Sequence, residues 1–300
     1  MEEPPNAADL MATMDRTLLK LAEEPSILSA ATSAARSSST EELEGLEQIT
    51  QKFAPLTLEK EFQDLYRVLN PSLTQLNNTS VIIQGSRGSG KSLLVQQVLL
   101  SIQANYRIVY IHGVAVPGAN VEAVIHEIVR QLANDDIYKL SNQNFSNQVQ
   151  LLNEILQLAH ADGIPLLFVL DELDAFLCHR QLILYTLLER VATSGSLCNI
   201  LGLTVDVNFM TKLEKRVKSR LEGTSTKFIV LGPCKSYDDL VKVLCSTIDC
   251  EELRNQVVRV LNDPEQFEAL QRQYRLGKSV RWFRRVLYHA RALYRNDLDS

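Results

Sequence analysis

Eight residues, Gly85 to Ser92, match the pattern G-x-x-x-x-G-K-[ST] without a mismatch (GSRGSGKS). Glycines in such a loop let the backbone turn tightly and direct its N–H groups toward phosphate oxygens. Lys91 can then reach the β- and γ-phosphates, and the Ser92 hydroxyl can ligate Mg²⁺. The spacing therefore predicts a nucleoside triphosphate site whose loop residues are Gly85, Ser86, Arg87, Gly88, Ser89, Gly90, Lys91 and Ser92.

A pair of acids forms the second chemical pattern. Asp171 and Glu172 directly follow the apolar run Leu166–Leu170. Ligands of open α/β sheets bind at the carboxyl ends of the strands, where a first acid holds Mg²⁺ and a second orients or deprotonates water. Strand ends are often acidic, so the pair alone is a weak signal. Because it follows a phosphate loop, we predict Asp171 as a Mg²⁺ ligand and Glu172 as a potential base.

Four more polar positions are candidates, and three of them have a simpler alternative. Thr204 ends an apolar run and either contacts the γ-phosphate or is a strand-end threonine with β propensity. Arg216 and Arg220 belong to a basic stretch, 213–223, which is either a solvated helix or the place of an arginine finger for a neighbouring subunit's nucleotide. Arg281 lies near the start of a C-terminal helical pattern, from which it can reach the phosphates.

Strand and helix patterns alternate around these residues. The apolar runs predict five strands, at 81–84, 107–111, 166–170, 199–204 and 228–231. Helical spacing over 121–132, 152–159 and 181–191 supplies crossover connections. Continuous apolar strands joined in this way indicate a mostly parallel sheet covered on both faces. After Pro233 only helical patterns follow, so we expect an α/β nucleotide-binding core at 49–233 and a small all-helical lid domain at 234–300.

The composition is that of an ordinary globular protein, with 45% hydrophobic and 22% charged residues. No stretch approaches the roughly 20 apolar residues of a membrane helix, and we expect no membrane partner. The N-terminus is acidic and shows no apolar signal-peptide stretch, so we expect the cytosol or nucleus. The five cysteines contain no C-x-x-C pair and are interpreted as reduced thiols. Residues 1–48 hold ten acids and three bases and are rich in Ala and Ser, so we expect a disordered or partly helical arm.

The net charge of −5 is unevenly distributed. From Arg272 to Arg295 there are eight basic residues and no acid, including the adjacent Arg284 and Arg285. This segment is either a solvated helix face or a surface for a polyanion or protein partner. Phe53–Leu58, just before the first strand, is a positional guess for the adenine pocket.

Four segments occur in order along the chain: GSRGSGKS, FVLDELDAF, ILGLTVDVNFMTKLEKRVKSRL and LGKSVRWF. Together they resemble AAA+ ATPases of the replication-initiator type, the family of the origin recognition complex subunits. The string EKRVKSR is the most specific part, and the resemblance covers roughly residues 50–295. It implies a P-loop AAA+ fold with a RecA-like parallel five-stranded sheet, helices on both faces and a helical lid.

The resemblance also implies a function. It suggests a nuclear, ATP-binding subunit of a ring-like heteromeric complex that marks replication origins, binds double-stranded DNA and works with helicase-loading factors. The implied partners are the other origin recognition complex subunits, especially the largest, whose ATP Arg220 would reach with support from Arg216. The remaining implied roles fall on Gly85–Ser92 and Asp171 for ATP and Mg²⁺, Glu172 as potential base, Thr204 as first sensor and Arg281 as second sensor.

The resemblance is incomplete at three points. Arg281 departs in spacing from the usual G-D-x-R pattern. Family members carry a winged-helix domain after the lid, whereas this sequence ends at NDLDS. The family often holds ATP as a structural ligand with slow turnover, so an intact acid pair leaves enzymatic activity open. Two other hypotheses remain: a free-standing P-loop ATPase in signalling, transport or remodelling, and an interaction module with a degenerate site.

Overall fold

The computed structural model describes residues 46–52, 54–114, 121–132, 145–177, 181–193, 197–223, 226–246, 248 and 251–298. Most of the expected N-terminal arm, residues 1–45, lies outside them. Residues 46–48 begin a short helix at 46–52.

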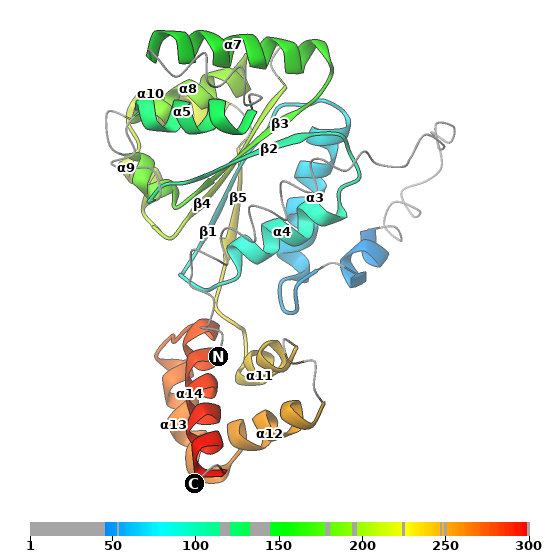
Figure 1. The fold of residues 1–300 in the computed structure, drawn as a ribbon, viewed down its shortest axis with the longest axis vertical. Coiled ribbons are helices and arrows are strands. Elements are labelled where there is room, and N and C mark those ends of the chain that lie inside the picture. Colours follow the sequence, from blue (N-terminus) through cyan, green and yellow to red (C-terminus); the bar gives the residue numbers. More distant parts are fainter. Residues whose placement is uncertain are drawn as a thin grey trace.

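Five parallel strands form the central sheet, in the order β2-β3-β4-β1-β5 (Figure 1). Their bounds are β1 Ser80–Gly85, β2 Arg107–His112, β3 Leu166–Asp171, β4 Cys198–Thr204 and β5 Lys227–Leu231. Every residue of β3 and β4 is buried, as expected for central strands covered on both faces. The predicted parallel sheet is confirmed, and each strand lies where the apolar runs placed it. The carboxyl ends of β1, β3 and β4 consequently meet at one edge.

Helices cover both faces of this sheet (Figure 1). On one face pack α3 (Glu59–Thr74) and α4 (Lys91–Ser101), whose apolar side chains meet Leu201 and Leu203 of β4. On the other face lie α5 Val121–Leu132, α7 Phe145–Ala161, the 3-10 turn η2 Leu173–Leu177, α8 Leu182–Ala192, α9 Phe209–Lys212 and α10 Lys215–Gly223. Because strand side chains alternate between faces, Thr204 follows Ile200 onto this second face.

A separate group of helices follows β5 and Gly232–Pro233. These are α11 Tyr237–Cys245, α12 Glu251–Leu261, α13 Pro264–Arg275 and α14 Val280–Leu298. They enclose a small core of their own that includes Tyr237, Leu240 and Phe283. Ser236 caps α11 by accepting a hydrogen bond from the Asp239 N–H at 3.0 Å. We base the proposed division into 49–233 and 234–300 on this second core.

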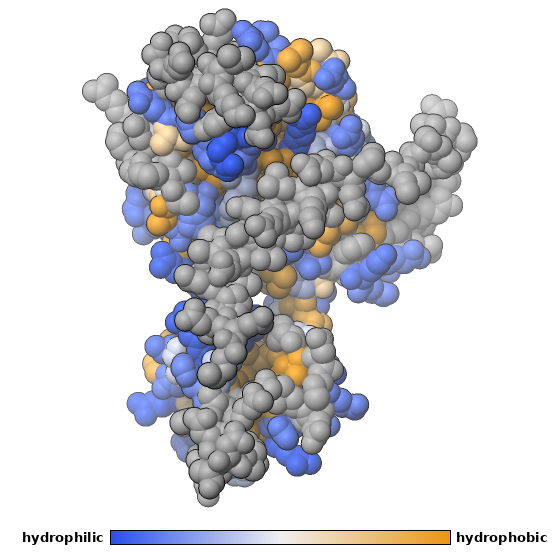
Figure 2. All heavy atoms as spheres, viewed as in Figure 1, coloured by the Kyte–Doolittle hydropathy of each residue, from blue (hydrophilic) through white to orange (hydrophobic). Residues whose placement is uncertain are grey.

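The helical group lies next to the end of the sheet from which the loop after β1 extends (Figure 1), and apolar atoms are visible in the region where the two parts join (Figure 2). In the part of the chain that the structure describes, no helix has the length and apolar character needed to cross a membrane.

Candidate functional site

The loop between β1 and α4 has a backbone that requires glycine. Gly88 and Gly90 have φ angles of 81° and 94°, a left-handed conformation that side chains disfavour. A Cβ atom on Gly85 would lie 2.7 Å from Ser89 Oγ and 2.9 Å from the Leu231 carbonyl oxygen. Gly85 is therefore packed closely between Leu231 of β5 and Ser89 of the loop.

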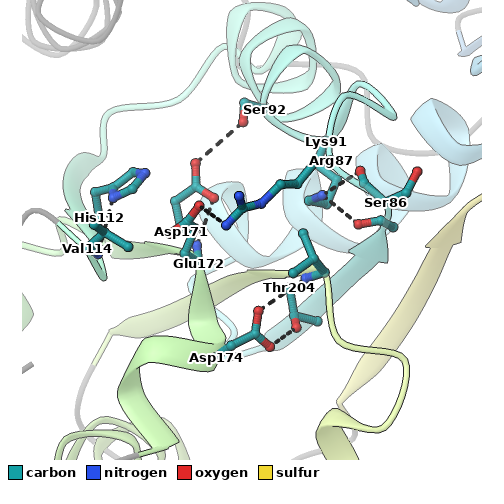
Figure 3. A network of polar contacts seen from close by, with 12 residues as sticks. Ser86, Arg87, Lys91, Ser92, His112, Val114, Asp171, Glu172, Asp174 and Thr204 are labelled. Atoms are coloured by element: carbon teal, nitrogen blue, oxygen red, sulfur yellow. Dashed lines mark hydrogen bonds and ion pairs between the residues drawn. The ribbon is translucent and has the colours of Figure 1, made fainter. Parts of the chain in front are cut away.

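Lys91 begins α4 and is almost completely buried. Its ammonium group donates hydrogen bonds to the carbonyl oxygens of Gly85 (2.7 Å) and Ser86 (3.0 Å), as Figure 3 shows for Ser86. Burial lowers the pKa of Lys91, an effect that the nearby carboxylates of Asp171, Asp174 and Glu172 oppose. These acids help to keep the buried ammonium charged.

The Asp171 carboxylate faces the start of α4 across the loop (Figure 3). Its Oδ2 atom accepts a hydrogen bond from the Tyr110 hydroxyl at 2.6 Å, and Ser92 Oγ lies 3.5 Å from the same oxygen. Asp171 Oδ1 accepts from the Glu172 N–H at 2.8 Å. The structure thus brings together Ser92 and Asp171, the two predicted Mg²⁺ ligands, and adds Tyr110 from β2.

Glu172 has an unusual backbone for a non-glycine residue, with φ of 52°. A Cβ on Gly113 would approach the Glu172 carbonyl oxygen to 2.7 Å, so the neighbouring loop can pack closely only because it has a glycine there. The Glu172 carboxylate points toward the phosphate loop and pairs with Arg87 at 3.5 Å (Figure 3). Strained conformations of this kind gather at functional sites.

Thr204 is 1% exposed, and its hydroxyl is fully engaged. It donates to Asp174 Oδ1 (Figure 3) and accepts from the Asp206 N–H at 3.0 Å. Asp174 Oδ2 also accepts from the Val205 N–H at 3.3 Å. Asp174 therefore joins η2 to the end of β4. Leu203 and Val205 line the adjoining cavity, whereas the structure does not place Thr204 in its wall.

A cavity of about 910 Å³ opens over the loop. Its wall includes the whole of Ser86–Ser92, the acid pair, residues 54–58 and the lid segment 277–281. Ala54–Leu58, most of the segment suggested for the adenine pocket, thus lines this cavity, while Phe53 falls outside the described residues. Seven Lys or Arg side chains and three carboxylates line the cavity, which gives an excess of four positive charges.

The lid contacts the phosphate loop directly. A Cβ on Gly88 would lie 3.1 Å from the Cβ of Ser279 and 3.6 Å from that of Arg281. Arg281 lines the cavity and is close enough to Lys91 for its charge to lower the pKa of Lys91. The structure thus brings this predicted residue to the loop. Arg284, one helical turn further along α14, also lines the cavity.

The loop residues fit a bound triphosphate. The Ser89 hydroxyl is buried and has no hydrogen-bond partner among the residues that the structure describes, a state that is costly unless a ligand or water satisfies it. The glycine geometry leaves room where side chains would block the loop. A polyphosphate would supply acceptors for Ser89, Lys91 and the N–H groups of the loop, and Mg²⁺ suits the oxygens of Ser92 and Asp171.

Arg216 and Arg220 lie on α10, outside the wall of this cavity. The Arg220 guanidinium lies 3.9 Å from the ring centre of Tyr185 on α8, and the Arg216 guanidinium lies 5.1 Å from the same centre. Arg220 also donates to the Tyr185 hydroxyl at 2.6 Å and pairs with Glu189 at 3.3 Å. The two arginines therefore share one aromatic support and stand apart from the chain's own loop.

Comparison with known proteins shows which families the chain resembles. A model of the AAA ATPase domain matches residues 56–200, which include the phosphate loop and the acid pair. Origin recognition complex subunit 4 of Homo sapiens is 25% identical over 238 residues, covering 74% of this chain and 54% of that protein. The Schizosaccharomyces pombe subunit 4 is 31% identical over 205 residues, covering 61% and 20%.

Residues 56–200 of the chain thus resemble an AAA ATPase domain, and the chain is similar to origin recognition complex subunit 4 of several eukaryotes. It spans about half the length of the human relative that it matches. Solved structures support the fold alone. A Drosophila ORC structure bound to DNA superposes with a TM-score of 0.52 at 16% identity, covering 80% of this chain and 60% of that chain. The Aeropyrum pernix ORC1 protein in complex with DNA gives 0.50 at 20% identity, covering 65% and 50%.

Three residues escaped the sequence analysis, Tyr110, Asp174 and Tyr185, and Arg284 was singled out there only as part of the basic segment 272–295. Asp174 stood within the DELD string, two residues after Glu172, and could have been noticed there. Arg284 follows Arg281 by three positions, a spacing that places both on one helix face. No sequence pattern indicates the contacts of Tyr110 and Tyr185, which lie in an apolar strand and an apolar helix.

Proposed function

We propose that this chain is an ATP-binding AAA+ subunit of a nuclear origin recognition complex. In this role it binds replication-origin DNA as part of a heteromeric ring and supports helicase loading. The observation that carries the proposal is the cavity at the carboxyl edge of the sheet, where the phosphate loop, Asp171 and the lid arginine Arg281 converge. Its excess positive charge complements a phosphate chain.

At this site the residues have separate tasks. The loop N–H groups and Lys91 would hold the phosphates, and the Ser92 and Asp171 oxygens would hold Mg²⁺, which would neutralise phosphate charge. Tyr110 fixes the orientation of the Asp171 carboxylate through its hydrogen bond. Glu172 would act as the potential base that accepts a proton from water. The family resemblance favours slow turnover and a mainly structural or regulatory role for ATP.

We further propose that Arg220 acts on the ATP of a neighbouring subunit, the largest of the complex. Its place outside the chain's own cavity supports action in trans. The Tyr185 ring holds the guanidinium in one orientation, which reduces the entropy lost when it meets a phosphate. Arg216 contacts the ring of the same Tyr185, and we propose that it supports Arg220 in this role.

The test uses the complex assembled with its cognate subunits. Arg220→Ala should lower ATP hydrolysis by the complex by roughly a thousandfold, the usual contribution of an arginine finger, while this chain's own ATP affinity stays unchanged. Lys218→Ala, on the same helix but paired with Glu222, is the matched control. Vigorous hydrolysis by the isolated chain that ignores Arg220→Ala would instead favour the free-standing ATPase. Lys91→Ala without effect on ATP binding or assembly would favour the interaction module.

A further inference from the structure

Glu61 is a carboxylate in the wall of the nucleotide cavity that does not belong to the acid pair. It lies in the first turn of α3. Its Oε2 atom is buried, and no group in the described part of the chain donates a hydrogen bond to it. A buried oxygen in this state is costly, because it has lost water and gained no donor in exchange. A ligand that brings a hydrogen-bond donor to this point would satisfy it.

Contacts of the phosphate loop distinguish two sides of the cavity. On one side the loop meets the lid, since a Cβ on Gly88 would lie 3.6 Å from the Cβ of Arg281. On the other side a Cβ on Gly90 would lie 3.1 Å from Leu58 Cδ1. Leu58 directly precedes α3, whose first turn carries Glu61. Glu61 therefore belongs to the Leu58 side of the loop, and Arg281 to the Gly88 side.

The charges around Lys91 agree with this division. Three carboxylates raise the pKa of Lys91 against the effect of burial, and they are those of Asp171, Asp174 and Glu172. Glu61 is not among the described groups whose charge acts on that pKa. Because the lysine of a phosphate loop reaches the β- and γ-phosphates, Glu61 stands apart from the groups that would surround them.

The wall on the Leu58 side has the character of a base pocket. It includes the segment Ala54–Leu58, and the lid adds Cys234 and the apolar Leu240 and Val243. Thr57 shares a side-chain hydrogen bond with Cys234, which joins this segment to the start of the lid. A nucleotide has one flat and largely apolar group, its base, and mostly apolar walls with a few polar groups suit such a group.

We propose that Glu61 selects adenine by accepting a hydrogen bond from the amino group at C6 of the base. Hypoxanthine and guanine have a carbonyl oxygen at C6, which would leave Oε2 without a donor and face it with a second acceptor. A single buried oxygen suits one amino group, whereas the adjacent N1 and N2 donors of guanine would require both carboxylate oxygens. The proposal rests on the proposed function, since it requires that the cavity binds ATP, and it adds the residue that reads the base.

Calorimetric titration of the full chain with ATP and with ITP, each in the presence of Mg²⁺, tests this assignment. ITP has the ribose and phosphates of ATP but a carbonyl oxygen at C6. The wild-type chain should bind ATP roughly tenfold to a hundredfold more tightly than ITP, the usual effect of a hydrogen bond to a charged group.

Glu61→Gln should bring the two affinities within about threefold of each other, mainly by strengthening ITP binding, because an amide can accept from an amino group and donate to a carbonyl oxygen. A gain in ITP affinity cannot come from a damaged fold. Glu59→Gln is the matched control. Glu59 lies in the same turn of α3, but it is exposed, accepts from the Thr57 N–H at 3.1 Å and is outside the cavity wall. This variant should keep the wild-type ratio.

Several results would overturn the assignment. If Lys91→Ala abolishes ATP binding while Glu61→Gln leaves the ATP-to-ITP ratio unchanged, the proposed function stands and the role of Glu61 is refuted. Equal binding of ATP and ITP by the wild-type chain refutes base selection in the same way. Tighter binding of GTP than of ATP would show that the pocket reads guanine. If the wild-type chain binds none of these nucleotides, the proposed function fails and this assignment fails with it.

Discussion

Replacing Thr204 by valine tests what this strand-end hydroxyl does. Valine keeps the shape of threonine but removes the hydroxyl that donates to Asp174 and accepts from the Asp206 N–H. A hydrogen bond to a charged group contributes about 1.5–3 kcal/mol, and Thr204 is 1% exposed, so water cannot replace the hydroxyl. We expect Thr204→Val to lower the free energy of unfolding by about 2–3 kcal/mol.

A double-mutant cycle isolates the contact. Thr204→Val, Asp174→Asn and the double variant are unfolded in urea, and the coupling energy should exceed roughly 1 kcal/mol because the two side chains bind each other. The ratio of ATP to ADP affinity should stay at the wild-type value in Thr204→Val, since the hydroxyl is committed to Asp174 and not to the cavity. Additive effects on stability would refute the contact. A selective loss of ATP affinity in Thr204→Val alone would instead make Thr204 the phosphate sensor that the family resemblance implies.

Two other changes test the loop and the acid. Gly85→Ala should cost about 1–3 kcal/mol of stability, because the new Cβ meets the Leu231 carbonyl oxygen at 2.9 Å; thermal unfolding checks this, and Gly232→Ala, where a Cβ meets nothing within 4 Å, should cost much less. Equal melting temperatures for the two variants would contradict the close packing. Tyr110→Phe removes the 2.6 Å hydrogen bond to Asp171 and should weaken the Mg²⁺-dependent part of ATP binding by roughly tenfold. Titrations with Mg²⁺ and with EDTA separate that part, and an equal loss in both would show a general structural effect.

The sheet and the loop were predictable because their signals are local. An apolar run of five or six residues indicates a strand. The residue types and spacing of Gly85 to Ser92 are enough to indicate a phosphate-binding loop. The meeting of Ser92 with Asp171 followed from the rule that parallel strands present their carboxyl ends at one edge. These inferences need no knowledge of side-chain orientation.

The other contacts depend on tertiary structure that no short pattern encodes. Thr204 turns to Asp174 because η2 folds back under the end of β4, a contact across 30 positions. Sequence could assign a polar residue to that strand end, but not the face on which its hydroxyl is satisfied. Arg284 lines the cavity and Arg285 does not, a difference that can be seen only when the orientation of the lid helix is known. In both cases the residue type was visible and its partner was not.

The segment Gly232–Pro233 between β5 and α11 gives the cavity a further property. Since the cavity wall contains residues from before and after this segment, a bound nucleotide would act as a second, noncovalent tether between the two parts. Two weak attachments held at high effective concentration dissociate together far more slowly than either does alone. A nucleotide held in this way would leave slowly, and its residence time would measure how firmly the lid is fastened to the sheet.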